Sequence, residues 1–190
     1  MNHSDKPAIY ALILCGGESR RMGSDKASLV YKGHSLLHHA KSIVVNAGVT
    51  EVFSVGGASH DIQDTKAFQG PAFATASALS TLRTSVPTLS SFIVLPVDMP
   101  LLAEHMLRDL LNNALTRKTS CYYEDQPFPF VLYHPFKHMP VLENLLSISK
   151  GPSIRRLLSL LNAEQIEPPV EGETSFFNVN SPTEWKQLKR

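Results

Sequence analysis

Short apolar runs alternate with helical patterns along the first half of the chain. Residues 9–14 form a continuous apolar run, which predicts a strand covered on both faces, as in a parallel sheet. Two more strands are predicted at 51–55, closed by Gly56 and Gly57, and at 92–95. Helices are predicted at 35–47, at 71–85 and around Met106, Leu107, Leu110 and Leu111. This alternation is typical of right-handed βαβ units on a parallel sheet.

Capping residues mark several helix ends. Ser35 is expected to cap the helix at 35–47, and Gly48 to end it. Near the end of the chain, Ser181 supplies an N-cap, Pro182 a first helical position and Glu184 a capping-box carboxylate, which together predict a short last helix. The segment before it is less regular. Strands at 121–123 and 130–133 are expected to pair across a turn at 125–127, with a helix near 141–149.

The composition is that of an ordinary globular protein. The 190 residues are 43% apolar and 18% charged, so we expect one domain over residues 1–190 with a full core, and a loose tail at residues 1–7. The formal net charge of +1 gives no bulk attraction to nucleic acid or to an anionic membrane. Neither class of partner is therefore expected.

The cysteine content indicates a reducing compartment, and so a cytoplasmic protein without a disulfide framework. The apolar run that ends at Cys15 loosely resembles a lipoprotein signal. It is only eight residues long, however, and Leu14 stands where a small residue would precede cleavage. The run is also too short to span a bilayer. The two cysteines lack the spacing of a metal site, and no dedicated zinc site is expected.

The loop after the first strand carries the groups that a triphosphate requires. Gly16 and Gly17 let backbone N–H groups approach an anion, and Ser19 offers a hydroxyl. Three cations follow, namely Arg20, Arg21 and Lys26. An anionic ligand would relieve the repulsion among them. The loop matches neither a Walker A sequence nor GxGxxG, which disfavours kinase-like ATP hydrolysis and hydride transfer to a nicotinamide cofactor.

A second candidate loop contains Asp98, which follows the strand at 92–95. An unpaired buried carboxylate would be costly there, and Mg²⁺ is a suitable partner because it prefers one or two carboxylates plus phosphate oxygens. Ligands bind outside the carboxyl ends of parallel strands, where the strand order reverses, so both loops are expected at one site. Structural interpretations stay open: Gly16 and Gly17 as an ordinary turn, Asp25 as a partner of Lys26 or a helix cap, and Asp98 as a helix cap.

At these residues the chain resembles the molybdenum cofactor guanylyltransferases and their wider nucleotidyltransferase relatives. The strongest match is LILCGGESRRMGSDKA at 12–27, against a family signature of the LAGGxSxRMGxDKA type, with Cys15 in place of the usual alanine. Further matches occur in order along nearly the whole chain. They are Asp64 with Gly70-Pro71, LPVDMPLL at 95–102, PFVLY at 129–133, residues 153–158, and FFNVNSP at 176–182.

The resemblance implies a Rossmann-like, three-layer α/β nucleotidyltransferase fold with a mostly parallel central sheet. It implies GTP and molybdopterin as substrates and Mg²⁺ as the cofactor. The sequence does not reveal the oligomeric state or protein partners; a monomer or weak oligomer with transient docking to a molybdoenzyme chaperone is the working expectation. The implied catalytic residues are Arg20, Lys26 and Asp98, with Asp98 also the metal ligand. The implied nucleotide-binding residues are Leu14, Cys15, Gly16, Gly17, Ser19, Arg21, Lys26, Asp64 and Asp98. Asn178 and Asn180 would lie close to the acceptor or the metal and are assigned to acceptor binding; without the resemblance they would be interpreted as turn residues before the last helix.

One departure from the family pattern leaves alternatives open. Relatives commonly carry GPLAG where this chain reads GPAFA at 70–74, so neither the base nor the acceptor is fixed by the sequence. The expected reaction joins the terminal phosphate of molybdopterin to the GMP part of GTP and releases pyrophosphate. The alternatives are a related nucleotidyltransferase that uses CTP or another phosphorylated acceptor, and a non-catalytic nucleotide-binding module.

Overall fold

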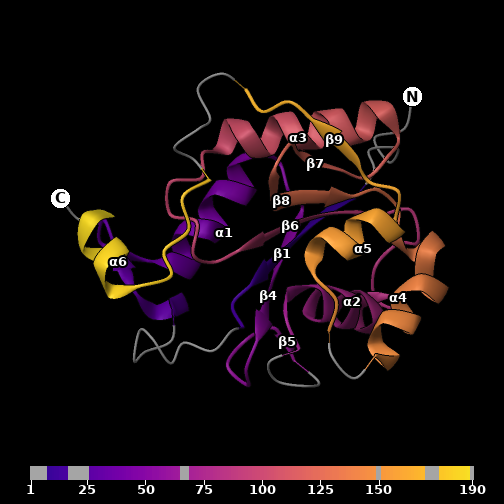
Figure 1. Ribbon diagram of the computed structural model, residues 1–190, viewed down its shortest axis with the longest axis horizontal. Coiled ribbons are helices and arrows are strands. Elements are labelled where there is room, and N and C mark those ends of the chain that lie inside the picture. Colours follow the sequence, from indigo (N-terminus) through magenta and orange to yellow (C-terminus); the bar gives the residue numbers. More distant parts are fainter. Residues whose placement is uncertain (1–7, 17–25, 65–68, 149–150, 170–175, 189–190) are drawn as a thin grey trace.

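A seven-stranded sheet forms the centre of the protein. The computed structural model describes residues 8–16, 26–64, 69–148, 151–169 and 176–188 (Figure 1). Across the sheet the strands are β5 (Ile62–Gln63), β4 (Glu51–Gly56), β1 (Ile9–Leu14), β6 (Ser91–Pro96), β8 (Gln126–Leu132), β7 (Cys121–Tyr123) and β9 (Glu164–Ile166). Within this described sheet β8 alone runs antiparallel to the other strands. The expected mostly parallel sheet is therefore confirmed.

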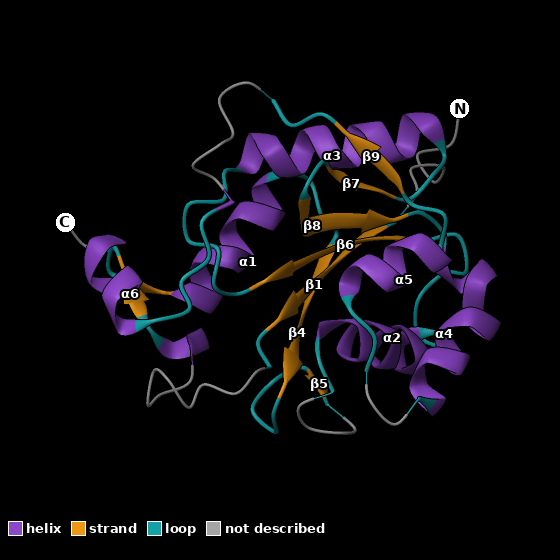
Figure 2. Ribbon diagram, viewed as in Figure 1, coloured by secondary structure: helices purple, strands orange, loops and turns teal. Residues whose placement is uncertain are grey.

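Helices cover both faces of this sheet and make three layers (Figure 2). On one face lie α1 (Leu36–Asn46) and α3 (Glu104–Arg117), with α6 (Pro182–Leu188) packed at its margin. On the other face lie α2 (Pro71–Leu82), α4 (Met139–Ser147) and α5 (Ile154–Leu160). Figures 1 and 2 show α6 at the far side of the molecule from α4. This is the layered α/β architecture that the strand and helix pattern predicts.

Burial on both faces explains why the central strands are continuously apolar. In β1, Ala11 and Ile13 join the core beneath α1 and α3, whereas Leu12 and Leu14 join the core beneath α2. Strand β6 divides its residues in the same way. Because side chains alternate between the faces of a strand, a strand with a helix layer on each side has no position for a polar residue.

Most predicted helix ends lie within three residues of the observed ones. The Ser35 hydroxyl accepts the His38 N–H at 3.1 Å, and Gly48, with φ at +98°, follows the end of α1. Helix α2 ends at Leu82 rather than at the predicted residue 85. At α6 the capping carboxylate of Glu184 accepts the N–H of Asn180 at 2.7 Å, one residue earlier than an ordinary capping box.

The second half follows the predicted order with shifted bounds. Strands β7 and β8 pair in antiparallel fashion, as expected, but β8 begins at Gln126, inside the predicted turn. The predicted helix near 141–149 is α4 at 139–147. Several short elements were not predicted: β5, β9, α5, the hairpin of β2 (Val30–Tyr31) and β3 (His34–Ser35), and the 3-10 helices η2 (Lys26–Ser28) and η3 (Pro135–His138).

The strand order reverses beside β1. The chain passes from β1 to β4 on one side and later returns to β6 on the other, so the carboxyl ends of β1 and β6 border a crevice. Backbone hydrogen bonds tie the end of β1 to both neighbouring strands: Val97 N–H, just after β6, donates to Leu14 O at 3.0 Å, and Cys15 N–H donates to Val55 O of β4 at 2.8 Å. None of the helices in the described part of the chain has the length and apolar character needed to cross a membrane.

Candidate active site

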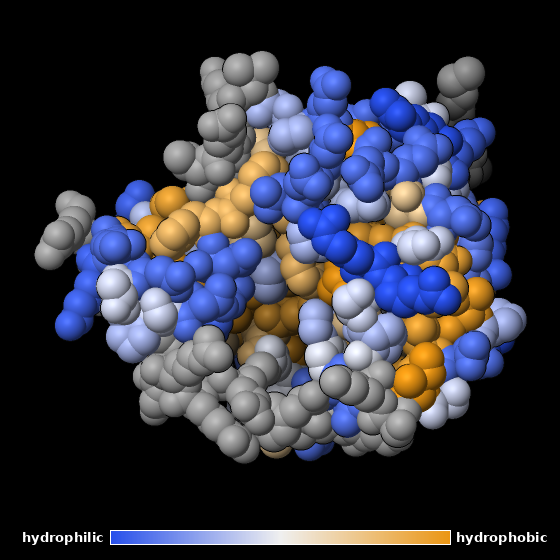
Figure 3. All heavy atoms as spheres, viewed as in Figure 1, coloured by the Kyte–Doolittle hydropathy of each residue, from blue (hydrophilic) through white to orange (hydrophobic). Residues whose placement is uncertain are grey.

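A cavity of about 380 Å³ opens at the carboxyl ends of β1 and β6. Its lining comprises Leu14, Cys15, Gly16, Lys26, Pro71, Pro96, Val97, Asp98, Phe128, Asn178 and Asn180. Figure 3 shows a hollow near the middle of this face, with hydrophobic colouring on its floor. The cavity therefore brings together most of the predicted site residues that the structure describes, from segments far apart in the chain.

Lys26 and Asp98 meet directly in this cavity. The Lys26 Nζ atom lies 2.6 Å from Asp98 Oδ2, and the two side chains are only 19% and 15% exposed. Lys26 Nζ also donates to Asn180 Oδ1 at 3.0 Å. Lys26 is the first residue of η2 and Asp98 follows β6, so the reversal in strand order brings together two charges that are 72 positions apart.

The C-terminal segment is fastened to the loop that carries Asp98. Val179 N–H donates to Asp98 O at 2.9 Å, and the Val179 side chain is buried. Its neighbours Asn178 and Asn180 are exposed and line the cavity. This alternation, typical of extended backbone, explains why the two asparagines and not the residue between them face the site.

The alternative role for Asp98 as a helix cap is wrong. Helix α3 begins at Glu104, its N-cap residue is Ala103, and no side chain caps it. The carboxylate of Asp98 is instead directed at Lys26. Asn180 has contacts in both directions: its N–H donates to Glu184 at the start of α6, and its side-chain oxygen accepts a hydrogen bond from Lys26. Its expected role in acceptor binding stays a prediction.

The donor set around Lys26 suits a hard cation. Asp98 Oδ2 and Asn180 Oδ1 already converge on one positive charge, the Lys26 ammonium. Oxygen ligands of this kind are those that Mg²⁺ and similar ions prefer, and Mg²⁺ needs few protein ligands when phosphate oxygens complete its shell. Among the described residues, no three His, Cys, Asp or Glu side chains gather around a common point. Asp98 is thus the carboxylate of the cavity lining that fits a cation.

The start of α2 adds a favourable environment for an anion. Pro71 is the first residue of this helix and lines the cavity, and Gly70 precedes it with φ at +88° and no side-chain cap. The N-terminus of a helix carries partial positive charge and free N–H groups. Together with Lys26, it gives the cavity two sources of positive potential for phosphate groups.

Asp64 lies on the β4 side of Gly16. A Cβ atom on Gly16 would lie 2.6 Å from Asp64 Oδ2, so the carboxylate rests against the bare backbone and would have to shift if Gly16 carried a side chain. Asp64 N–H donates to Gly56 O at 2.7 Å. Burial raises the pKa of Asp64, and the charge of His60 acts in the opposite direction. Asp64 Oδ1 is buried and, in the part of the chain that is described, has no hydrogen-bond partner.

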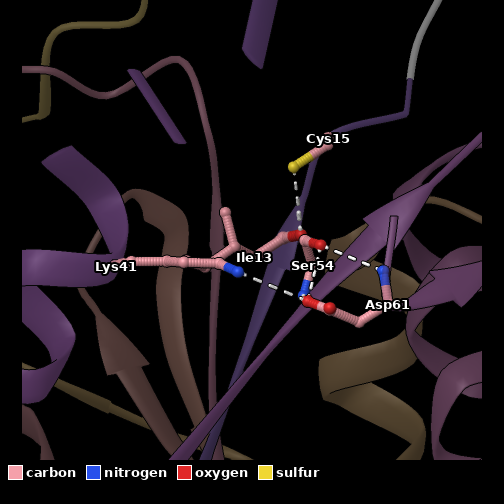
Figure 4. A network of polar contacts seen from close by, with 5 residues as sticks. All are labelled: Ile13, Cys15, Lys41, Ser54 and Asp61. Carbon is pink, nitrogen blue, oxygen red and sulfur yellow. Dashed lines mark hydrogen bonds and ion pairs between the residues drawn. The ribbon is translucent and has the colours of Figure 1, made fainter. Parts of the chain in front are cut away.

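A polar network holds the connection between β4 and β5 in place (Figure 4). The Asp61 carboxylate accepts the Ser54 N–H at 2.8 Å and the Ser54 hydroxyl at 2.7 Å, and Lys41 Nζ lies 3.5 Å away. Asp61 N–H donates back to the Ser54 hydroxyl at 3.1 Å. The network fixes the turn that leads to Asp64.

Some of the predicted site residues lie outside the part of the chain that the structure describes, and some residues of interest in the structure were not predicted from the sequence. Gly17, Ser19, Arg20, Arg21 and Asp25 lie outside the described residues, so their expected roles stay predictions. Phe128, a wall of the cavity, is not predicted as a site residue, because it falls between the predicted turn at 125–127 and the predicted strand at 130–133 and belongs to no motif. The stacked rings of His34 and His38, 4.6 Å apart, were also missed, although a spacing of four at a helix start was the available signal.

Residues 11–167 match the family described as the MobA-like NTP transferase domain. The chain belongs to this family. The match spans β1 to β9 and so includes both loops that supply Lys26 and Asp98. Membership confirms the nucleotidyltransferase class that the two loops indicate.

Known relatives of this MobA-like chain cover nearly its full length. A molybdenum cofactor guanylyltransferase of Xanthomonas euvesicatoria pv. vesicatoria is 29% identical over 180 residues, covering 93% of this chain and 92% of the relative. The molybdopterin-guanine dinucleotide biosynthesis protein A of Archaeoglobus fulgidus has the same fold, with a TM-score of 0.64, 19% identity, and 95% and 96% of the two chains covered. A Mycobacterium tuberculosis protein crystallised with manganese also shares the fold, with a TM-score of 0.61, 15% identity, and 96% and 98% coverage.

Proposed function

We propose that this protein transfers GMP from GTP to the terminal phosphate of molybdopterin, forming molybdopterin guanine dinucleotide and releasing pyrophosphate. Its family consists of NTP transferase domains. One relative is a molybdenum cofactor guanylyltransferase, and the match covers 92% of that relative's length. The cavity at the carboxyl ends of β1 and β6 is lined by Lys26, Asp98, Asn178 and Asn180, which are among the predicted site residues.

The observation that carries the proposal is the contact between Lys26 and Asp98 inside the cavity. Nucleotidyl transfer needs positive charge against the triphosphate and a carboxylate for a divalent cation at the same place. A purely structural ion pair would not require an adjoining cavity of about 380 Å³. The position of the pair at the strand-order reversal, where ligands of open parallel sheets bind, supports the same function.

Mg²⁺ is the proposed cofactor, and Asp98 is the residue that would hold it. When bound, such an ion neutralises and polarises phosphate oxygens, which stabilises the charge of the transition state. The side chain of Asn180, which already binds Lys26, supplies a further oxygen beside Asp98. Lys26 is held between these two oxygens and is therefore positioned to offset charge on the triphosphate and the departing pyrophosphate.

The reaction requires no catalytic base from the protein. A phosphate monoester has a second pKa of about 6, so the terminal phosphate of the acceptor is already mostly dianionic at neutral pH and can attack the α-phosphorus itself. The residues of the cavity then act by positioning the two substrates and by electrostatic stabilisation.

Turnover measured with each of the four nucleoside triphosphates tests the proposal. Purified protein would be incubated with GTP, CTP, ATP or UTP, with and without molybdopterin and with and without Mg²⁺, while pyrophosphate is quantified and the dinucleotide product is identified by mass spectrometry. We expect product only with GTP, molybdopterin and Mg²⁺ together. Turnover with CTP instead, or nucleotide binding without turnover, would reject guanylyl transfer in favour of a related transferase or a binding module.

A further inference from the structure

Phe128 is the aromatic side chain of the cavity wall, and the reaction proposed above leaves it without a role. It lies near the start of β8, is only half-buried, and is the single aromatic residue among the described residues that line the cavity. Its ring packs at 5.4 Å from the ring of Phe130, which is fully buried. Phe128 is therefore anchored on one side and open to the cavity on the other.

Strand order places Phe128 at one end of the site. Gly16 follows β1 and Asp98 follows β6, and the next strand across the sheet is β8. Because β8 runs antiparallel to β6, its first residues lie at the same edge as the carboxyl ends of β1 and β6. Gly16, Asp98 and Phe128 therefore succeed one another along this edge, with Asp98 in the middle.

This order separates the places of the two substrates. Gly16 directly follows β1 and lines the cavity, so the triphosphate is proposed to bind on the β1 side. In an in-line displacement the attacking and leaving oxygens stand on opposite sides of the phosphorus. With the pyrophosphate on the β1 side of Asp98, the attacking phosphate and the rest of the acceptor occupy the β8 side. Phe128 is the wall of that side.

The chemistry around Phe128 suits a flat nitrogen heterocycle. Pro96 and Val97 make the adjoining surface apolar, while the exposed Asn178 side chain offers both a hydrogen-bond donor and an acceptor at the same cavity. Flat heterocycles stack on aromatic side chains and present donors and acceptors at their rims. We propose that Phe128 selects the acceptor of the reaction by stacking against its pterin ring in the β8 half of the cavity.

The inference rests on the proposed function and adds a specificity residue to it. Its test compares Phe128→Leu, which keeps apolar volume but removes the ring, with Phe128→Tyr, which restores a ring. Tyr133→Leu is the matched control, because Tyr133 directly follows the other end of β8, outside the cavity lining, and stacks on His134. Steady-state kinetics would be measured with GTP and molybdopterin varied in turn, and thermal melting would report folding.

We expect Phe128→Leu to raise the KM for molybdopterin about tenfold, which is the factor typical of one lost aromatic contact. The KM for GTP should change by less than about twofold. Phe128→Tyr should recover most of the acceptor affinity, and Tyr133→Leu should resemble the wild type in both constants. As a measurement independent of folding, a simple pterin without a phosphate group, such as 6-hydroxymethylpterin, should inhibit the wild type in competition with molybdopterin but not with GTP.

Other outcomes overturn the inference. An equal or larger rise in the KM for GTP would show that Phe128 contacts the nucleobase. Phe128 also packs against the hydrophobic cores on both faces of the sheet. A lower melting temperature with both KM values unchanged would show that its ring acts only in this packing. Competition of the free pterin with GTP would likewise reject the assignment. If the wild type forms no dinucleotide from molybdopterin, the proposed function fails together with this inference, whereas an active wild type with an unaffected Phe128→Leu variant rejects the inference alone.

Discussion

Ionisation of the Asp64 carboxylate lowers the free energy of unfolding of the protein. Burial raises its pKa above the ordinary 3.8, and His60 offsets this only in part. A carboxylate with a raised pKa in the folded state costs nothing below pH 3.8, where it is protonated in both the folded and the unfolded protein. The cost appears as the pH rises through the raised pKa and remains at neutral pH. Retaining such a group is reasonable if its unpaired Oδ1 receives a hydrogen bond from the nucleotide.

Asp64→Asn is therefore expected to stabilise the ligand-free protein and to weaken GTP binding. At pH 7 its melting temperature should exceed that of the wild type, and the difference should vanish below pH 3.8. The affinity for GTP should fall about tenfold, because a neutral amide oxygen accepts a weaker hydrogen bond than a carboxylate does. Melting curves across pH and calorimetric GTP titrations measure the two effects. A variant that is less stable at pH 7, with unchanged GTP affinity, would assign Asp64 a structural role.

Some contacts between residues of the site can be predicted from the sequence, and others cannot. The meeting of Lys26 and Asp98 follows from two loops at the ends of parallel strands, and the sequence predicts it. The contact of Lys26 with Asn180 spans 154 positions and has no periodic signal, so only the family resemblance indicates it. Phe128 gave no signal at all, because the sequence does not indicate which side of its ring remains open.

At the next scale, the connection between β4 and β5 depends on Asp61. Burial by itself would raise the pKa of Asp61, but hydrogen bonds from the N–H and hydroxyl of Ser54 and the charge of Lys41 outweigh it and lower the pKa. A lowered pKa means that Asp61 stabilises the fold above pH 3.8. This contribution is lost as the pH falls through the lowered value. The pH dependence is opposite to that of Asp64, which directly follows β5.

Asp61→Asn is expected to destabilise the protein at pH 7 by about 1 kcal/mol, or about 2–4 °C in Tm, because the side chain loses charged hydrogen bonds. The estimate is kept low because the Asp61 side chain is 46% exposed. The deficit should disappear in acid. Lys41→Met is the control, since its contact at 3.5 Å is exposed and should matter less. Equal melting temperatures of wild type and Asp61→Asn at pH 7 would refute the role of the network in Figure 4.

Long elements with a strong pattern were predictable, and short ones were not. Strand β1 was predicted with its bounds, because two helix layers leave no polar position in it. The strands of the β2–β3 hairpin have two residues each, too few for any period to show. Helix α5 has only seven residues, so the helical period of its apolar residues is too short to recognise, even though Ser153 caps it. The start of β8 was mistaken for a turn because Pro127 lies within it.

Considered as a whole, the molecule assembles its cavity from five distant parts of the chain. These are the end of β1 with η2, the start of α2, the end of β6 with the loop that carries Asp98, the start of β8, and the segment at 176–180. Only the first and third parts contain a sequence motif whose function can be inferred from the chemistry of its residues, without the family resemblance. The others enter through tertiary packing, as when Val179 binds the backbone of Asp98, and no local rule reports such contacts.

A double-mutant cycle on Lys26 and Asp98 tests most directly whether they form one reaction centre. The value of kcat/KM for dinucleotide formation would be compared among wild type, Lys26→Met, Asp98→Asn and the double variant. Arg83→Met and Glu143→Gln serve as controls, because that ion pair is 3.2 Å long, 55% exposed and outside the cavity lining. We predict losses of about 10²- to 10³-fold for each single variant, and a double variant little worse than the poorer single one. Losses that multiply in the double variant, or a single variant with wild-type turnover, would contradict a shared centre.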